Sequence, residues 1–156
     1  MYEIVNSLSD KRANLIKEVC CRYGEKRKVE GDTFVNSREI YDHFKIRLRH
    51  QEQESFICVY LDNKHRIISE KEISVGTLTQ SLVHPRECYA PAIQQRAAAI
   101  ILIHNHPSYD TKPSGADIKI TKRLIEVGKL VGIKVLDHVI IGDGYYSFVD
   151  EGTLPV

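Results

Sequence analysis

The residues of this sequence best suited to chemistry are two closely spaced histidines and an aspartate eleven positions after the second. His104 and His106 end the apolar run "AAAIILIHNH", and Asp117 follows in "PSGAD". Residues two apart in a strand point to the same side, so the two imidazoles can face one point. Two imidazoles and a carboxylate leave a fourth position open on zinc, which is typical of catalytic rather than structural sites. The spacing therefore predicts Zn²⁺ held by His104, His106 and Asp117.

The elements on either side of this loop must bring the three side chains together. Residues 97–103 are apolar throughout, which predicts a central strand, and ligand sites in α/β sheets gather at the ends of such strands. Ser114 and Asp117 fit the S-x-x-D capping box that begins a helix, predicted over 115–130. A purely structural cap is the alternative for Asp117. The two roles are compatible, because the first turn of a helix aims its carboxylate back at the preceding loop.

The remaining hydrophobic pattern predicts an α/β domain with a mixed sheet and helices packed on it. Asn36 to Glu39 resembles a capping box. We expect helices over 9–28, 37–50, 85–96 and 115–130. We expect strands over 56–61, 66–74, 97–103, 133–142 and 145–149.

Composition narrows the classes of protein to consider. The 156 residues fit one domain, and 22 basic against 21 acidic residues give a formal charge of +1. This balance makes no overall case for nucleic acid or an anionic membrane. No apolar run is long enough to span a membrane and no signal peptide begins the chain, so we expect a cytoplasmic protein. The four cysteines fit neither a metal knuckle nor a disulfide framework, and are expected to be small buried residues.

The sequence around the histidines is similar to a known family. His-x-His followed by an aspartate, with a serine three before it, is the JAMM motif of JAB/MPN-domain metalloproteases. Five separated segments together resemble the RadC family: "LDNKHRII", "SVGTLTQSLVHPRECYAPAI", "RAAAIILIHNHPS", "PSGAD" and "KVLDHVIIGDGYYSF". The resemblance covers roughly residues 35–150. It divides the chain into an N-terminal helix and linker (1–34) and a RadC-like JAB/MPN domain (35–156).

The resemblance implies a cytidine-deaminase-like α/β/α sandwich with one zinc ion. His104, His106 and Asp117 match the family's ligands, and Ser114 matches the motif serine beside the zinc-bound water or the oxyanion. The family's general base is a glutamate at the start of the first sheet strand. Here Glu52 and Glu54 both qualify, and we choose Glu54 because it directly precedes the apolar run. Glu70 and Glu72 are weaker candidates.

The chain departs from the family in the loop after the second histidine. RadC chains usually read His-Pro-Ser-Gly-Asp-Pro-Thr-Pro-Ser, whereas this chain has Tyr109, Thr111 and Lys112 in place of Gly, Pro and Thr. If the usual glycine has a positive φ, Tyr109 strains or reshapes the turn. No ligand is lost, so we expect zinc binding to survive. About 35 residues precede the match, so we do not expect the helix-hairpin-helix region of full-length RadC proteins in this sequence.

Two further pairs invite a functional interpretation. His84 and Arg86 either line the cleft or form a helix start with a surface charge pair. Asp137 and His138 either orient a zinc ligand or form a polar pair at a strand edge, which we favour.

The leading hypothesis is a zinc-dependent metallopeptidase or isopeptidase with a peptide or protein substrate. Zinc would lower the pKa of its bound water, Glu54 would take the proton, and Ser114 would help to stabilise the oxyanion. The alternative is a DNA-repair or mobile-element accessory protein that binds DNA or a DNA-bound partner, with a structural zinc, as suggested by the basic segment 22–28. A membrane partner is not expected, and the sequence does not indicate an oligomeric state.

Overall fold

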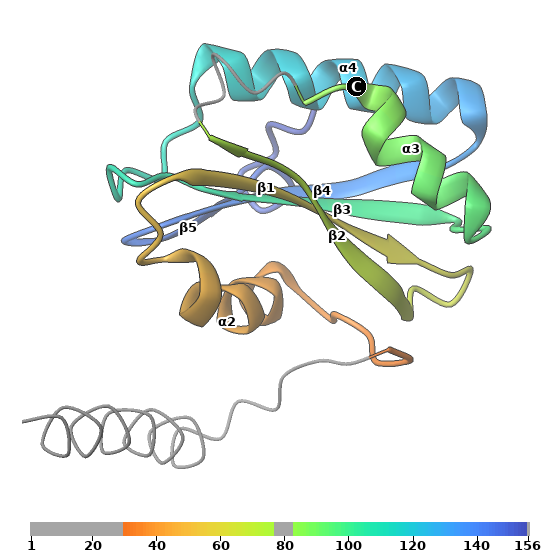
Figure 1. Ribbon diagram of the computed structural model, residues 1–156, viewed down its shortest axis with the longest axis horizontal. Helices are drawn as coiled ribbons and strands as arrows, with labels where there is room; N and C mark the ends of the chain where they lie inside the picture. The colour runs from red at the N-terminus through yellow and green to blue at the C-terminus, as the bar shows by residue number, and fades with distance from the viewer. Residues whose placement is uncertain (1–29, 77–82, 156) are drawn as a thin grey trace, which may run out of the picture.

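The computed structural model describes residues 30–76 and 83–155, which form a mixed α/β fold around one five-stranded sheet (Figure 1). The predicted α/β class with a mixed sheet is confirmed. The helix predicted over 9–28 lies outside the described residues. The strands are β1 (Glu54–Leu61), β2 (Ile67–Gly76), β3 (Ala99–Asn105), β4 (Lys134–Gly142) and β5 (Gly144–Ser147). The helices are α2 (Ser37–Leu48), α3 (Pro85–Gln94) and α4 (Gly115–Val131).

The sheet has the order β2-β1-β3-β4-β5, so β3 lies at its centre. Only β3 and β4 pair in parallel, while the other neighbours are antiparallel. Every residue of β3 is buried, as expected of a central strand. Strand β3 runs two residues beyond the predicted end at residue 103, because its pairing with β4 continues to Asn105. His104 therefore lies within the pleated strand.

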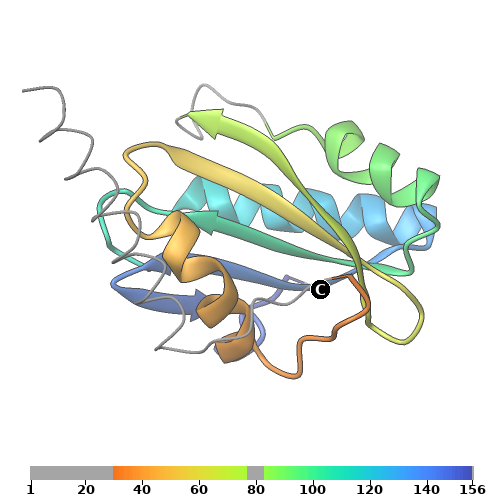
Figure 2. The same ribbon diagram turned by 60° about the horizontal axis from the view of Figure 1, so that its bottom comes forward.

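Helices cover both faces of the sheet, which gives three layers (Figures 1 and 2). Helix α2 packs on one face, where its Phe44 and Leu48 join a buried cluster with Ile57, Ile101 and Ile103 of the sheet. Helices α3 and α4 pack on the other face. There Cys88 and Leu124 form a second cluster with sheet residues that include Phe56, Cys58, Ile100 and Leu102. Alternation along β3 places His104 on the face of Ile100 and Leu102, toward α4.

Both ends of α4 carry the residues that helix termini favour. The Ser114 side chain accepts a hydrogen bond from the Asp117 amide at the N-terminus, and Gly132 adopts φ of 74° at the C-terminus. A left-handed conformation at this position favours glycine. Helix α4 thus begins where the capping box predicts and directs its first turn at the end of β3. Among residues 30–76 and 83–155, the helices are too short or too polar to cross a membrane.

Candidate metal centre

The side chains of His104, His106 and Asp117 converge where β3 ends and α4 begins. One ligand atom from each lies within 4.8 Å of the others, and all three residues are buried. The two imidazole Nε2 atoms are 2.9 Å apart, and they lie 3.2 and 3.3 Å from the Asp117 carboxylate oxygens. Ligands about 2.0–2.1 Å from a tetrahedral zinc ion are separated by about 3.3 Å. The three side chains can therefore hold a metal ion with little rearrangement.

His106 is held just beyond the end of β3 by main-chain contacts. Its amide donates to the Ile141 carbonyl of β4 at 2.9 Å, so the chain stays beside the sheet after β3 ends. Its ring Nδ1 lies 2.6 Å from the carbonyl oxygen of Asp110. A carbonyl only accepts hydrogen bonds, so Nδ1 carries the proton. The neutral ring then directs the lone pair of Nε2 toward His104 and Asp117.

Asp117 occupies the first turn of α4 with its carboxylate turned back over the loop. Oδ2 accepts from the amide of Ser114 at 2.6 Å, and the Ser114 Oγ accepts from the amide of Asp117 at 3.1 Å. The capping box is therefore complete. The other oxygen, Oδ1, is buried and has no hydrogen-bond partner among the described residues. A buried carboxylate oxygen left in this way beside two imidazole nitrogens fits a bound cation.

The charges in this cluster shift the pKa values of its members. Burial raises the pKa of Asp117, but the two neighbouring imidazoles outweigh it and the pKa is strongly lowered. Burial lowers the pKa of His106, yet the Asp117 carboxylate, the Asp110 carbonyl and the charge of Glu54 produce a net rise. Asp117 therefore remains an anion, the form that binds a metal ion.

Glu54 is the first residue of β1, and its charge acts on His106. Alternation places it on the α4 face, because Phe56, two residues on, packs in the α3 and α4 cluster and pairs with His104. Asn105 fixes this strand entry. Its Oδ1 accepts from the amide of Ser55 at 2.7 Å, and its Nδ2 donates to the carbonyl of Gln53 at 3.0 Å. The positioning contact of Asn105 was missed from the sequence, because it depends on the pairing of β1 with β3.

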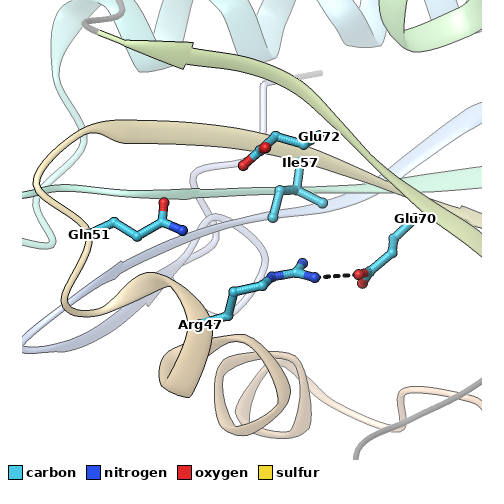
Figure 3. Close-up of a pocket in the computed structure, with 5 residues that line it drawn as sticks. All are labelled: Arg47, Gln51, Ile57, Glu70 and Glu72. Atoms are coloured by element: carbon cyan, nitrogen blue, oxygen red, sulfur yellow. Dashed lines mark hydrogen bonds and ion pairs between the residues drawn. The ribbon is translucent and has the colours of Figure 1, made fainter. Parts of the chain in front are cut away.

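The other glutamate candidates are placed differently. Glu52 precedes β1 and is exposed. Glu72 pairs with Ile57, whose side chain packs in the α2 cluster, and Glu70 lies two residues before Glu72. Both therefore lie on the face of the sheet opposite His104. They line a pocket with Arg47, Gln51 and Ile57, in which Arg47 and Glu70 form an ion pair (Figure 3).

The loop that departs from the RadC pattern, around Tyr109, is hydrogen-bonded to the turn between β4 and β5. Tyr109 adopts φ of 64°, the left-handed conformation that glycine would accept at lower cost, and the residue is 47% exposed. Its carbonyl accepts from the amide of Asp143 at 2.8 Å. At Gly142 a Cβ atom would lie 2.4 Å from that carbonyl oxygen. Only glycine therefore allows the loop and the turn to approach so closely.

The structure also tests three expectations about residues other than His104, His106 and Asp117. The strand-edge interpretation of Asp137 and His138 is wrong, since β4 pairs on both sides and both residues are buried. Instead, His138 contacts His104 through ring nitrogens 2.8 Å apart. His84 caps α3, and Arg86 forms an exposed ion pair with Glu87. Cys58 and Cys88 are free and buried.

Comparison with known proteins identifies relatives of the chain. A family model described as a RadC-like JAB domain matches residues 34–153. The chain is 47% identical to a UPF0758 protein of Syntrophotalea carbinolica, over 88% of this chain and 61% of that protein. It is 49% identical to a UPF0758 protein of Geotalea uraniireducens, over 88% of this chain and 60% of that protein. A UPF0758 protein of Geobacter sulfurreducens is 43% identical, over 96% of this chain and 68% of that protein. The chain thus spans about 60% of the length of the first two relatives.

Proposed function

This chain belongs to the RadC-like JAB domain family, and on that premise we propose that it is a zinc-dependent metallopeptidase or isopeptidase of the JAMM type. The observation that carries the proposal is the buried convergence of His104, His106 and Asp117, with one Asp117 oxygen lacking a hydrogen-bond partner among the described residues. The substrate class is an amide bond in a peptide or a protein tail. The DNA-binding alternative draws on segment 22–28, which lies outside the described residues, and is not proposed.

Each residue of the centre has a role in amide hydrolysis. His104, His106 and Asp117 would hold the metal, and a zinc ion bound there would lower the pKa of its water and polarise the substrate carbonyl. Glu54 takes the proton from water and later passes a proton to the leaving amine. The Ser114 hydroxyl accepts one hydrogen bond within the capping box and still has a hydrogen to donate to the developing oxyanion.

The test combines metal content with single-residue changes at the base. Purified protein should contain one zinc ion per chain, and His104→Ala with His106→Ala should remove it, as measured by elemental analysis. Glu54→Gln should keep both zinc and fold yet lose peptidase activity, by about 100-fold or more, since an amide cannot take up the proton. Activity is measured on a peptide library.

Glu52→Gln is the matched control, because it makes the same chemical change two residues away at an exposed position. It should leave zinc content and activity unchanged. Equal zinc in the double variant and the unaltered protein would contradict the metal assignment. If Glu52→Gln were inactive and Glu54→Gln active, the base would be Glu52 and the rest of the proposal would stand.

A further inference from the structure

A buried chain of hydrogen bonds lies behind His104, on the side of its ring away from the metal position. The Nδ1 of His104 is 2.8 Å from the Nε2 of His138. The Nδ1 of His138 is 2.6 Å from the hydroxyl oxygen of Thr121, and that hydroxyl is 2.6 Å from the main-chain carbonyl oxygen of Asp117. The chain therefore starts at one candidate ligand and ends at another.

The direction of every hydrogen in this chain follows from its last member. The Asp117 carbonyl can only accept, so the single hydroxyl hydrogen of Thr121 points to it. The Thr121 oxygen then accepts from Nδ1–H of His138, which leaves a lone pair on the Nε2 of His138. That lone pair accepts from Nδ1–H of His104. In a neutral His104 ring, Nε2 is therefore the bare nitrogen.

The surroundings of His138 favour a neutral ring in this chain. Its side chain is fully buried between Phe148, stacked at 5.2 Å between ring centroids, and Phe56, edge-on at 5.5 Å. Burial between these two aromatic rings disfavours a positive charge on the His138 ring. A neutral ring has one donor and one acceptor, as the chain requires.

We propose that Thr121 and His138 are positioning residues that fix the tautomer of His104, so that its Nε2 always offers a lone pair to the metal. The inference rests on the proposed zinc site and adds two residues that do not touch the metal. Outer contacts of this kind set the orientation and tautomer of metal-binding histidines. Here the contact also links the His104 ring of β3 to α4, the helix that carries Asp117.

Thr121→Val and Thr121→Ser test the proposal as a matched pair. Valine has the shape of threonine without the hydroxyl, so Nδ1–H of His138 loses its acceptor. The other tautomer of His138, with its proton on Nε2, then becomes competitive. Its Nε2–H donates to the Nδ1 of His104, so the proton of a neutral His104 ring must lie on the metal-facing Nε2. We expect Thr121→Val to weaken zinc affinity by about 10–100-fold, measured by competition with a chromophoric chelator. Thr121→Ser keeps the hydroxyl and should bind within about threefold of the unaltered protein.

A second measurement begins with the unaltered protein. Nitrogen-15 NMR of the metal-free, unaltered protein should show the proton on Nδ1 of both His104 and His138. In metal-free Thr121→Val, the His138 signal should shift toward protonation at Nε2, while the thermal melt confirms that the variant is folded.

The outcomes separate the two proposals. Absence of zinc from the unaltered protein would contradict the proposed function, whatever the tautomers. Stoichiometric zinc with equal affinity in Thr121→Val and Thr121→Ser would overturn the inference alone. A proton on the Nε2 of His138 in the metal-free, unaltered protein would also overturn it.

Discussion

Asn105 lies between the two histidines in sequence, yet its side chain serves the neighbouring strand. It holds the main chain of residues 53 and 55, on either side of Glu54. Misplacement of a reacting group by about 1 Å can reduce a rate by about 100-fold. The three consecutive residues from His104 to His106 therefore combine two candidate metal ligands with the support for the proposed base.

Asn105→Ala should separate these roles. The change leaves the buried amide of Ser55 without its acceptor, which should lower the free energy of unfolding by about 1–3 kcal/mol. Zinc content should stay at one per chain, whereas kcat should fall by up to about 100-fold because Glu54 loses its fixed position. Chemical denaturation, elemental analysis and peptidase kinetics give the three values.

Gln51→Ala is the control for this prediction. Gln51 contacts the hydroxyl of Ser55 rather than its main chain. The Gln51→Ala variant should keep kcat within about twofold of the unaltered protein, since the main-chain contacts of Asn105 remain. A normal kcat in Asn105→Ala would show that the pairing of β1 with β3 is enough to position Glu54.

Helix α4 is set against α3 by a close contact at Gly128. A Cβ atom at Gly128 would lie 2.6 Å from the Tyr89 hydroxyl oxygen and 2.4 Å from the Ile133 carbonyl oxygen. The same Tyr89 hydroxyl donates to the carbonyl of Leu124 at 2.6 Å. The small residue therefore sets the distance between α4 and its neighbours, and through α4 the position of Asp117.

Gly128→Ala should be destabilising, although alanine usually favours a helix by about 1 kcal/mol. Here the added methyl meets main-chain atoms that cannot rotate away, and overpacking costs about 1–3 kcal/mol. We expect a net loss of up to about 2 kcal/mol in the free energy of unfolding. Lys129→Ala, one residue along the helix at an exposed position, is the control and should change stability by less than about 0.5 kcal/mol. A stabilised Gly128→Ala variant would mean that α3 moves away at little cost.

What the sequence could predict at this scale depended on local patterns. The His-x-His spacing and the Ser114–Asp117 capping box lie within fourteen residues, and both appear in the structure as predicted. The starts of strands were less predictable. Pairing with β2 begins at Glu54, before the apolar run starts, so hydrophobicity alone placed the start of β1 two residues late.

Contacts that cross the sheet could not be predicted. His138 reaches His104 only because β4 pairs in parallel with β3, with Leu102 opposite His138. The sequence contained both residues but not this register. Likewise, the sequence made Glu70 and Glu72 only weaker candidates for the base, and the pairing of Glu72 with Ile57 was needed to assign them to the α2 face.

At the scale of the described fold, two clusters of polar residues lie on opposite faces of the sheet. The candidate metal centre lies on the α4 face, and a charged pocket that includes Glu70 lies on the α2 face. The imidazole of His43, followed by the guanidinium of Arg47, lowers the pKa of Glu70 from 4.5 to about 2. Because the two sites lie on opposite faces of the sheet, we expect a change in the pocket to alter stability without altering the candidate metal centre.

Glu70→Gln should lower stability without affecting zinc or turnover. A carboxylate with a depressed folded-state pKa stabilises the protein fully above its unfolded pKa of 4.5, and this contribution is lost as pH falls toward about 2. Because the side chain is 29% exposed, we expect no more than about 1 kcal/mol at pH 7. Urea denaturation of both proteins at pH 7, 4 and 2.5 should show the difference shrinking. A difference that grew toward acid pH would contradict this account.

The close approach of Gly142 to the Tyr109 carbonyl has a consequence for how the loop after His106 can vary in sequence. A library that randomises residues 107–113 explores only backbone paths that still fit over the neighbouring turn. Any side chain at position 142 would clash with the Tyr109 carbonyl and push the loop out of its present backbone conformation. Variation in the loop and at position 142 is therefore epistatic, and recombination that exchanges the loop between relatives should succeed more often when the β4–β5 turn is exchanged with it.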